Sequence, residues 1–128
     1  MKVLVTGARG FIGSNLVGHL QRREDLKLFC HDIDNSREEL DAWLDEAHFV
    51  VHLAGVNRPK SEDEFFAGNA GLTSHICDRL ARRADPPPIL LSSSIQAQLD
   101  NPYGRSKRLA EEALIGYAEK TGARAIIY

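Results

Sequence analysis

The fold is decided by Val3-Leu4-Val5-Thr6-Gly7-Ala8-Arg9-Gly10-Phe11-Ile12-Gly13, an apolar run that leads into three glycines spaced three residues apart. Each glycine has a physical task in a strand–turn–helix unit: Gly7 allows a tight turn, Gly10 lets a pyrophosphate approach the backbone, and Gly13 lets the helix pack closely on the strand. The helix that follows would offer its first N–H groups and its dipole to the phosphates. The stretch predicts a dinucleotide-binding unit, with a purely structural glycine turn as the alternative.

An acidic residue follows at the distance that such a unit needs. Asp32 comes nineteen residues after Gly13, at the end of the next apolar run. A carboxylate there accepts hydrogen bonds from the adenosine ribose hydroxyls and repels a 2′-phosphate, so Asp32, with Asp34 close by, favours NAD(H). Two side chains that can carry positive charge, His31 and Arg9, keep NADP(H) open as the alternative.

Strand and helix patterns alternate along the chain, which is typical of an α/β fold with a doubly wound parallel sheet, the Rossmann fold. The strands are nearly continuous apolar runs, and such runs suit a parallel sheet that is covered on both faces. Strands are expected at residues 2–6, 26–31, 49–53, 89–92 and 123–127. The sheet is therefore expected to be truncated after about the fifth strand.

Start and stop signals mark the helices between these strands. Residues 36–39 and 61–64 both fit the capping box, in which a serine and a glutamate three residues apart bond to each other's free N–H groups. The pair at 101–102, asparagine then proline, reads as an N-cap and a first helical residue. The prolines at 86–88 are expected to stop the preceding helix, and Gly122 is expected to cap the last one.

Composition excludes several classes of partner. The 128 residues carry 16 basic and 18 acidic side chains, a net charge of −2, so no strong field draws the chain to nucleic acid or to an anionic membrane. No apolar run approaches the ~20 residues of a membrane span. The start, Met1-Lys2-Val3, leads into a strand instead of a signal peptide, so one cytoplasmic domain is expected. Cys30 and Cys77 are expected to be buried thiols, and no metal site is predicted because the histidines share no metal-ligand spacing.

A second stretch carries chemistry of its own: Tyr103-Gly104-Arg105-Ser106-Lys107, which follows the serine run Ser92-Ser93-Ser94. Lys107 comes four positions after Tyr103, so both side chains rise from one helix face about a turn apart. A lysine charge beside a tyrosine favours the phenolate and lowers its pKa, as proton transfer near neutral pH requires. A serine hydroxyl would complete such a site. The alternatives are an ordinary helix-surface pair and the polar end of a buried strand.

Together these residues resemble the extended short-chain dehydrogenase/reductase family, the NAD-dependent nucleotide-sugar epimerases, dehydratases and reductases. The likeness spans the whole chain and rests on motifs in the family's order: Thr6-Gly7-x-x-Gly10-x-x-Gly13, Asp32, His52-Leu53-Ala54-Gly55, Asn69, Ser92-Ser93-Ser94 and Tyr103-x-x-x-Lys107. A closer likeness is to the capsular polysaccharide UDP-sugar reductases that act in forming UDP-N-acetyl-L-fucosamine. It rests on the runs at 52–59, 91–97 and 100–104, and on the short connection that puts Tyr103 only nine positions after Ser94.

The resemblance implies roles for the matching residues. Tyr103 would be the general acid/base at a carbonyl of a nucleotide-linked sugar, Lys107 would lower its pKa and bind the nicotinamide ribose, and Ser94 would orient the substrate oxygen. Residues that would bind the cofactor are Gly7, Arg9, Gly10, Phe11, Ile12, Gly13, Asp32, Leu53, Ala54, Gly55, Tyr103 and Lys107. The reductases of this group use NADPH, whereas Asp32 favours NAD(H).

Three further residues have two interpretations each. Asn69 is either the family's strand-bridging asparagine or a plain helix-surface amide. Arg58 and Lys60, which follow the third expected strand, either meet a substrate phosphate or are solvated loop charges. The residue types alone do not decide between these interpretations.

The resemblance also bears on domains and partners. Family members continue past the fifth strand into a substrate domain, and the capsular reductases add a metal-binding cupin domain. Residues 1–128 are therefore expected to be the NAD(P)-binding domain without the substrate domain, with doubtful turnover by themselves. The helices expected at 64–84 and 103–120 are those that pack in family dimers, so a homodimer is expected. Two functions stay open: an oxidoreductase domain acting on a nucleotide sugar, and a catalytically silent dinucleotide-binding module or sensor.

Overall fold

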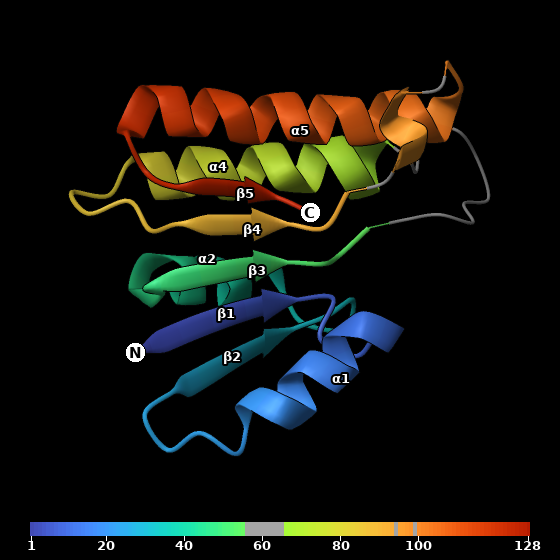
Figure 1. Ribbon diagram of the computed structural model, residues 1–128. Helices are drawn as coiled ribbons and strands as arrows, with labels where there is room; N and C mark the ends of the chain where they lie inside the picture. Colours follow the sequence, from blue (N-terminus) through green and yellow to red (C-terminus); the bar gives the residue numbers. More distant parts are fainter. Residues whose placement is uncertain (56–65, 94, 99) are drawn as a thin grey trace.

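The computed structural model describes residues 1–55, 66–93, 95–98 and 100–128 of the chain. Five parallel strands form one sheet in the order β2-β1-β3-β4-β5, and all of them run in the same direction in Figure 1. The strands are Lys2–Thr6 (β1), Lys27–His31 (β2), Phe49–His52 (β3), Ile89–Leu91 (β4) and Ala125–Ile127 (β5). The doubly wound parallel sheet that the sequence predicts is confirmed.

Helical elements connect the strands. They are Phe11–Leu20 (α1), Arg37–Glu46 (α2), the π-helix Phe66–Gly71 (η1), Leu72–Ala81 (α4), the 3₁₀-helix Ile95–Gln98 (η2) and Pro102–Thr121 (α5). In Figure 1, α4 and α5 lie side by side over one face of the sheet, and α1 lies beside β2. The predicted capping box at 61–64, and the residues Arg58, Lys60 and Ser94, lie outside the described part of the chain.

The strands other than β1 are one or two residues shorter than the sequence predicts. β5 begins at Ala125 because the backbone N–H of Ala123 still donates to Thr121 Oγ1 (3.1 Å), at the end of α5. At the carboxyl edge of the sheet, β3 and β4 each end one residue earlier than predicted. The N–H of Ser92 donates to the carbonyl of His52 at 3.1 Å, so the pairing of β3 with β4 reaches one residue past the end of β4.

Side chains of alternate strand residues point to opposite faces of the sheet, and each face has its own apolar core. On one face, strand residues such as Leu4, Val50 and Ile89 pack against α2, α4 and α5. The helices contribute Leu40 and Leu44 from α2, Ile76, Cys77 and Leu80 from α4, and Ala110, Leu114 and Tyr117 from α5. On the other face, Val3 and Val5 pack with α1. This two-sided burial explains the nearly continuous apolar strands.

Three of the predicted helix signals are confirmed. In the capping box of α2, the Glu39 N–H donates to Ser36 Oγ at 3.1 Å, and the Ser36 N–H donates to the Glu39 carboxylate at 3.4 Å. Asn101 Oδ1 accepts from the Gly104 N–H at 2.7 Å and caps α5, which starts at a proline. Gly122 ends α5 in the left-handed conformation, at a φ of 74°.

The end of α4 differs from the prediction. We expected the three prolines to stop a helix that reached residue 84, but α4 ends at Ala81, before the prolines are reached. Its last turn tightens, because the Arg83 N–H donates to the carbonyl of Leu80, three residues back. The Arg83 guanidinium donates to the carbonyls of Leu44 and Ala47 at 2.9 and 2.6 Å, at the end of α2. These bonds hold the segment just after α4 to the end of α2.

Candidate functional site

The glycine turn has the geometry that close backbone contact requires. Gly7 has a φ of +69°, and a Cβ built on it would lie 2.8 Å from the Ala54 nitrogen. A Cβ on Gly13 would lie 2.0 Å from the Gly7 carbonyl oxygen, so that position of α1 admits no side chain. A Cβ on Gly10 would lie 3.3 Å from the same oxygen. The turn at Gly7 and the close packing at Gly13 are therefore as the sequence predicts.

The first turn of α1 is open to an anion. Its N-cap is Gly10, so no side chain caps the helix, and the first turn has no acidic residue. The first N–H groups of a helix have no intrahelical acceptor and lie at the positive end of its dipole. Phe11 and Ile12 are exposed beside them, at 86% and 60%. This helix end fits a pyrophosphate.

A cavity of about 420 Å³ lies at the carboxyl edge of β1, β2 and β3. It is lined by Gly7, Gly10, His31, Asp32, Ile33, Leu53, Ala54, Gly55, Gly68 and Leu72. The cavity therefore brings together the glycine turn, the acidic residue after β2 and the segment after β3. The sequence placed all three in the cofactor site, and the crevice outside the carboxyl ends of the strands is where doubly wound sheets bind ligands.

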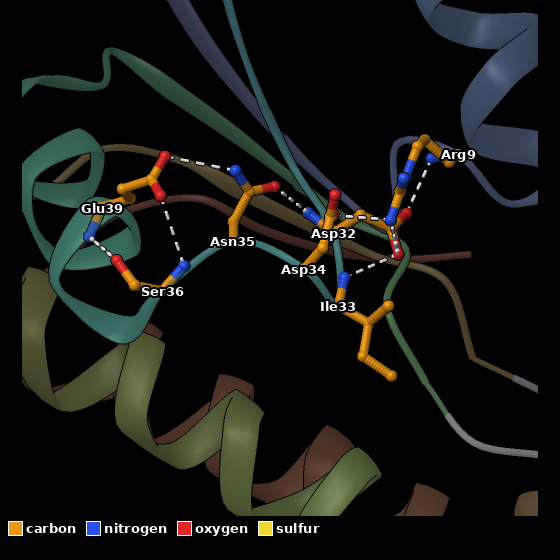
Figure 2. A network of polar contacts seen from close by, with 7 residues as sticks. All are labelled: Arg9, Asp32, Ile33, Asp34, Asn35, Ser36 and Glu39. Carbon is orange, nitrogen blue, oxygen red and sulfur yellow. Dashed lines mark hydrogen bonds and ion pairs between the residues drawn. The ribbon is translucent and has the colours of Figure 1, made fainter.

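Asp32 is fixed by hydrogen bonds from the backbone. Its carboxylate accepts from the N–H groups of Arg9 and Ile33, at 2.8 and 2.7 Å. Burial acts to raise the pKa of Asp32, but these two bonds, together with the nearby charges of Arg9 and His31, hold the pKa below its ordinary value. Asn35 Oδ1 accepts from the Asp32 N–H at 2.8 Å, and the Asn35 amide donates to Glu39 (Figure 2). The network presents an ionised carboxylate at the cavity wall.

The Arg9 side chain lies beside this carboxylate. Its Nη2 is 2.5 Å from Asp34 Oδ1 and 3.9 Å from Asp32 Oδ1, as Figure 2 shows. The Arg9 and Asp34 side chains are both mostly exposed. Since the Arg9 N–H already donates to Asp32, the part of Arg9 that remains for a ligand is its guanidinium.

A chain of buried polar groups connects the strands to α5. The ring of the fully buried His52 lies 2.6 Å from Thr6 Oγ1 through Nδ1 and 2.9 Å from Thr73 Oγ1 through Nε2. Thr73 donates to the Asn69 carbonyl at 2.6 Å. The Asn69 amide donates to Ser106 Oγ at 3.0 Å.

The chain of polar groups ends at the backbone of the predicted catalytic tyrosine, because the Ser106 hydroxyl donates to the Tyr103 carbonyl at 2.7 Å. Thr6, Thr73 and Ser106 were missed in the sequence, where only His52, in the middle of an apolar strand run, stands out as a polar group that needs partners. Asn69 is 2% exposed, so its interpretation as a helix-surface amide is wrong.

Tyr103 and Lys107 lie one turn apart near the start of α5, and the lysine lies close to Gly55, a residue that lines the cavity. Lys107 is 8% exposed, and its Nζ donates to the Ser92 carbonyl at 3.3 Å. The Nζ atom lies 6.0 Å from the centre of the Tyr103 ring. A Cβ on Gly55, which lines the cavity, would lie 3.3 Å from the same Nζ. Burial lowers the pKa of Lys107, and Glu111 opposes this shift.

Within the described residues, no group of three or more His, Cys, Asp or Glu side chains could hold a metal ion. Cys77 is buried, and burial raises its pKa to about 12. Cys30 is only half-buried, so the prediction of two buried thiols is wrong for it, although burial raises its pKa too. In the same part of the chain, no helix is long and apolar enough to cross a membrane.

A glycine turn and a helix end at the carboxyl edge of a parallel sheet, with a carboxylate after the second strand, are the features with which doubly wound domains bind dinucleotides. The chain belongs to the NAD dependent epimerase/dehydratase family, whose sequence profile matches residues 3–128. The resemblance inferred from the motifs is thereby confirmed.

Two individual proteins are similar to this chain over its whole length. The chain is 43% identical over all of its 128 residues to UDP-2-acetamido-2,6-beta-L-arabino-hexul-4-ose reductase of Pseudomonas aeruginosa, of which it covers 34%. It matches capsular polysaccharide assembling protein CapF of Staphylococcus aureus at a TM-score of 0.85 and 47% identity, covering 100% of this chain and 35% of CapF. The chain thus spans about a third of the length of both proteins.

A more distant structure supports the fold alone. UDP-glucuronic acid 4-epimerase of Bacillus cereus, solved in complex with NAD, matches 99% of this chain and 55% of its own at a TM-score of 0.86. Its sequence identity to this chain is 19%. The sheet and its helices are therefore shared with a protein whose sequence has diverged widely.

Proposed function

We propose that this chain is the cofactor-binding and proton-transfer part of an oxidoreductase that reduces a keto group of a UDP-linked sugar with a nicotinamide cofactor. The observation that carries the proposal is the position of Lys107, whose Nζ would lie 3.3 Å from a Cβ built on Gly55, a residue that lines the cavity. This position joins the Tyr103–Lys107 pair of α5 to the cavity beside the glycine turn. A silent binding module would have no need for that connection.

The residues around the cavity fit a nicotinamide dinucleotide. Pyrophosphate would bind at the glycine turn, against the first N–H groups of α1 from Phe11 to Gly13. The Asp32 carboxylate would accept from the adenosine ribose, and residues 53–55 would line the adenosine side. When bound, the cofactor would supply the hydride. We favour NAD(H) because an ionised Asp32 repels a 2′-phosphate, with NADP(H) as the alternative.

The protein's own part in the reaction would be proton transfer. Tyr103 would donate its phenolic proton to the substrate oxygen, and the Lys107 ammonium would stabilise the phenolate that remains. Ser94 would hold the same oxygen by a hydrogen bond. The Ser106 bond to the Tyr103 carbonyl would keep the first turn of α5 in place while the proton moves.

The relatives support the substrate class. The Pseudomonas aeruginosa relative is named as a reductase of a UDP-linked hexul-4-ose, and CapF as a capsular polysaccharide assembling protein. We propose that residues 1–128 form the NAD(P)-binding domain of a similar enzyme. We also keep the homodimer as a proposal, supported by Leu109 and Ile115, which α5 leaves exposed at 44% and 47%. The cytoplasmic location stays a prediction.

Cofactor binding is the first test. The chain is titrated with NADH and with NADPH, and the fluorescence of the reduced nicotinamide is followed. We expect saturable binding of at least NADH. If neither nucleotide binds, the proposed function is wrong.

Proton transfer is the second test. Tyr103→Phe is compared with Tyr117→Phe, a control on the same helix whose hydroxyl donates to the Pro87 carbonyl. Turnover of a UDP-linked 4-keto sugar is measured with the chain fused to the part of the Pseudomonas aeruginosa reductase that it does not cover. We expect Tyr103→Phe to retain cofactor binding and to lose turnover by roughly 100-fold or more, whereas Tyr117→Phe retains turnover. Equal turnover of the two variants would exclude Tyr103 as the acid.

A further inference from the structure

We propose that Asp34 is a specificity-determining residue, which selects NADH against NADPH by competing with the 2′-phosphate for the Arg9 guanidinium. The inference rests on the proposed nicotinamide site and goes beyond it, because it concerns a residue outside the cavity lining. It starts from the three charged side chains that meet between the β1–α1 turn and the end of β2 (Figure 2).

The two carboxylates beside Arg9 have different tasks. The Asp32 side chain is 21% exposed and is held by two backbone N–H groups, so it is fixed at the cavity wall. The Asp34 side chain is 65% exposed, and it pairs with the Arg9 guanidinium. The ribose of a bound dinucleotide would therefore meet Asp32, whereas Asp34 acts on the arginine.

The position of Arg9 makes this competition possible. In doubly wound sheets an arginine near the end of the second strand accommodates the 2′-phosphate of NADP. The Arg9 Nη2 lies 3.9 Å from Asp32 Oδ1, so the guanidinium is already next to the expected ribose position. A 2′-phosphate that binds the same Nη2 would compete with Asp34, whose Oδ1 lies 2.5 Å from it.

The net charge of the side chains around Arg9 also disfavours NADPH. Asp32, Asp34 and Arg9 sum to one negative charge, since two carboxylates face one guanidinium. His31, next to Asp32, adds little positive charge near neutral pH because burial lowers its pKa. A 2′-phosphate would enter a region that is already negative, so NADPH binding is disfavoured unless a carboxylate is removed.

The experiment measures dissociation constants of NADH and NADPH for the same chain. We expect Asp34→Asn to shift the NADH-to-NADPH affinity ratio toward NADPH by roughly fivefold, the upper range for an exposed ion pair. The shift should shrink at high salt, because the charges are exposed. The matched control is Asp45→Asn, which breaks an exposed carboxylate–arginine pair with Arg79 at 2.7 Å on α2 and α4. The control should leave the ratio unchanged.

A double-mutant cycle identifies the arginine as the group through which Asp34 acts. Arg9→Ala keeps the N–H that binds Asp32 but removes the guanidinium. In that background, Asp34→Asn should shift the ratio by less than about twofold. An unchanged ratio in Asp34→Asn alone, or the same shift with and without Arg9, would overturn the inference while leaving the proposed cofactor site intact. Binding of neither nucleotide by the unmodified chain would instead count against the proposed function, and the inference would fall with it.

Discussion

The His52 ring donates a hydrogen bond from Nε2 to Thr73 Oγ1, 2.9 Å away, and this direction follows from the neighbouring bonds. A hydroxyl has one proton, and Thr73 gives it to the Asn69 carbonyl, so Thr73 must accept from the ring. The Nδ1 atom of the neutral ring then accepts from Thr6 Oγ1 at 2.6 Å. Thr6 Oγ1 in turn accepts from the Ala54 N–H at 3.2 Å. One tautomer of His52 therefore satisfies every bond in this part of the chain.

Removing the acceptor of the His52 N–H should destabilise the fold. Thr73→Val keeps the shape of the side chain but leaves a buried N–H without its acceptor, which costs about 1–3 kcal/mol. Thr73→Ser keeps the hydroxyl and should cost less, because only a methyl group is lost. Urea unfolding of the two variants measures the difference. If valine is tolerated as well as serine, the hydrogen bond contributes nothing to stability.

The buried His52 should make stability depend on pH. Burial, with a smaller effect of the Lys107 charge, lowers the pKa of His52 from 6.5 to about 3. Between these values the unfolded chain takes up a proton that the folded chain does not bind. The contribution of neutral His52 to the free energy of unfolding is therefore complete above pH 6.5. It is lost as the pH falls toward 3, by about 1.4 kcal/mol per pH unit.

The His52 contribution can be separated from that of other groups by substitution. His52→Gln should flatten the fall in unfolding free energy between pH 6.5 and about pH 5. His19→Gln, an exposed position on α1, is the matched control and should leave the slope unchanged. A slope for His52→Gln equal to that of the unmodified chain would show that His52 does not titrate as described.

Local signals predicted much of the fold and part of the site. The turn at Gly7, the capping box at Ser36 and the cap at Asn101 each depend on a few neighbouring residues, and the structure has all three. Asp32 was found in the same way, because its distance from the glycine turn is a property of the βαβ unit.

Other features could not be predicted from the sequence, because they depend on contacts between segments that are far apart along the chain. His52 bonds to Thr6 and Thr73, which are 46 and 21 residues away. No spacing rule relates these positions, so the sequence predicts neither the partners of His52 nor a role for the two threonines. The pairing of Arg9 with Asp34 is similar, since it requires the β1–α1 turn to lie beside the end of β2.

Two glycines of α1 should respond in opposite ways to alanine. A Cβ at Gly13 would lie 2.0 Å from the Gly7 carbonyl oxygen, so Gly13→Ala must separate α1 from the turn at a cost of about 2 kcal/mol or more. Gly18 has nothing within 4 Å of the added atom. Gly18→Ala should stabilise by about 0.5–1 kcal/mol through helix propensity. Thermal unfolding compares them, and equal midpoints would contradict the close packing at Gly13.

Gly55 is where the cavity meets the polar chain, so its substitution should affect cofactor binding more than folding. A Cβ there would lie 2.7 Å from Asn69 Oδ1 and 3.3 Å from Lys107 Nζ, so the Asn69 amide must move. That amide donates to Ser106, which donates to the Tyr103 carbonyl, and the displacement would reach the first turn of α5.

We expect Gly55→Ala to weaken NADH binding by roughly tenfold, the equivalent of a modest overpacking cost. Gly116→Ala on α5, where the added atom has nothing within 4 Å, is the matched control and should bind NADH like the unmodified chain. Nicotinamide fluorescence gives both affinities, and urea unfolding shows whether the variants fold. Unchanged NADH affinity in a folded Gly55→Ala chain would mean that the packing of Gly55 against Asn69 and Lys107 does not shape the cofactor site.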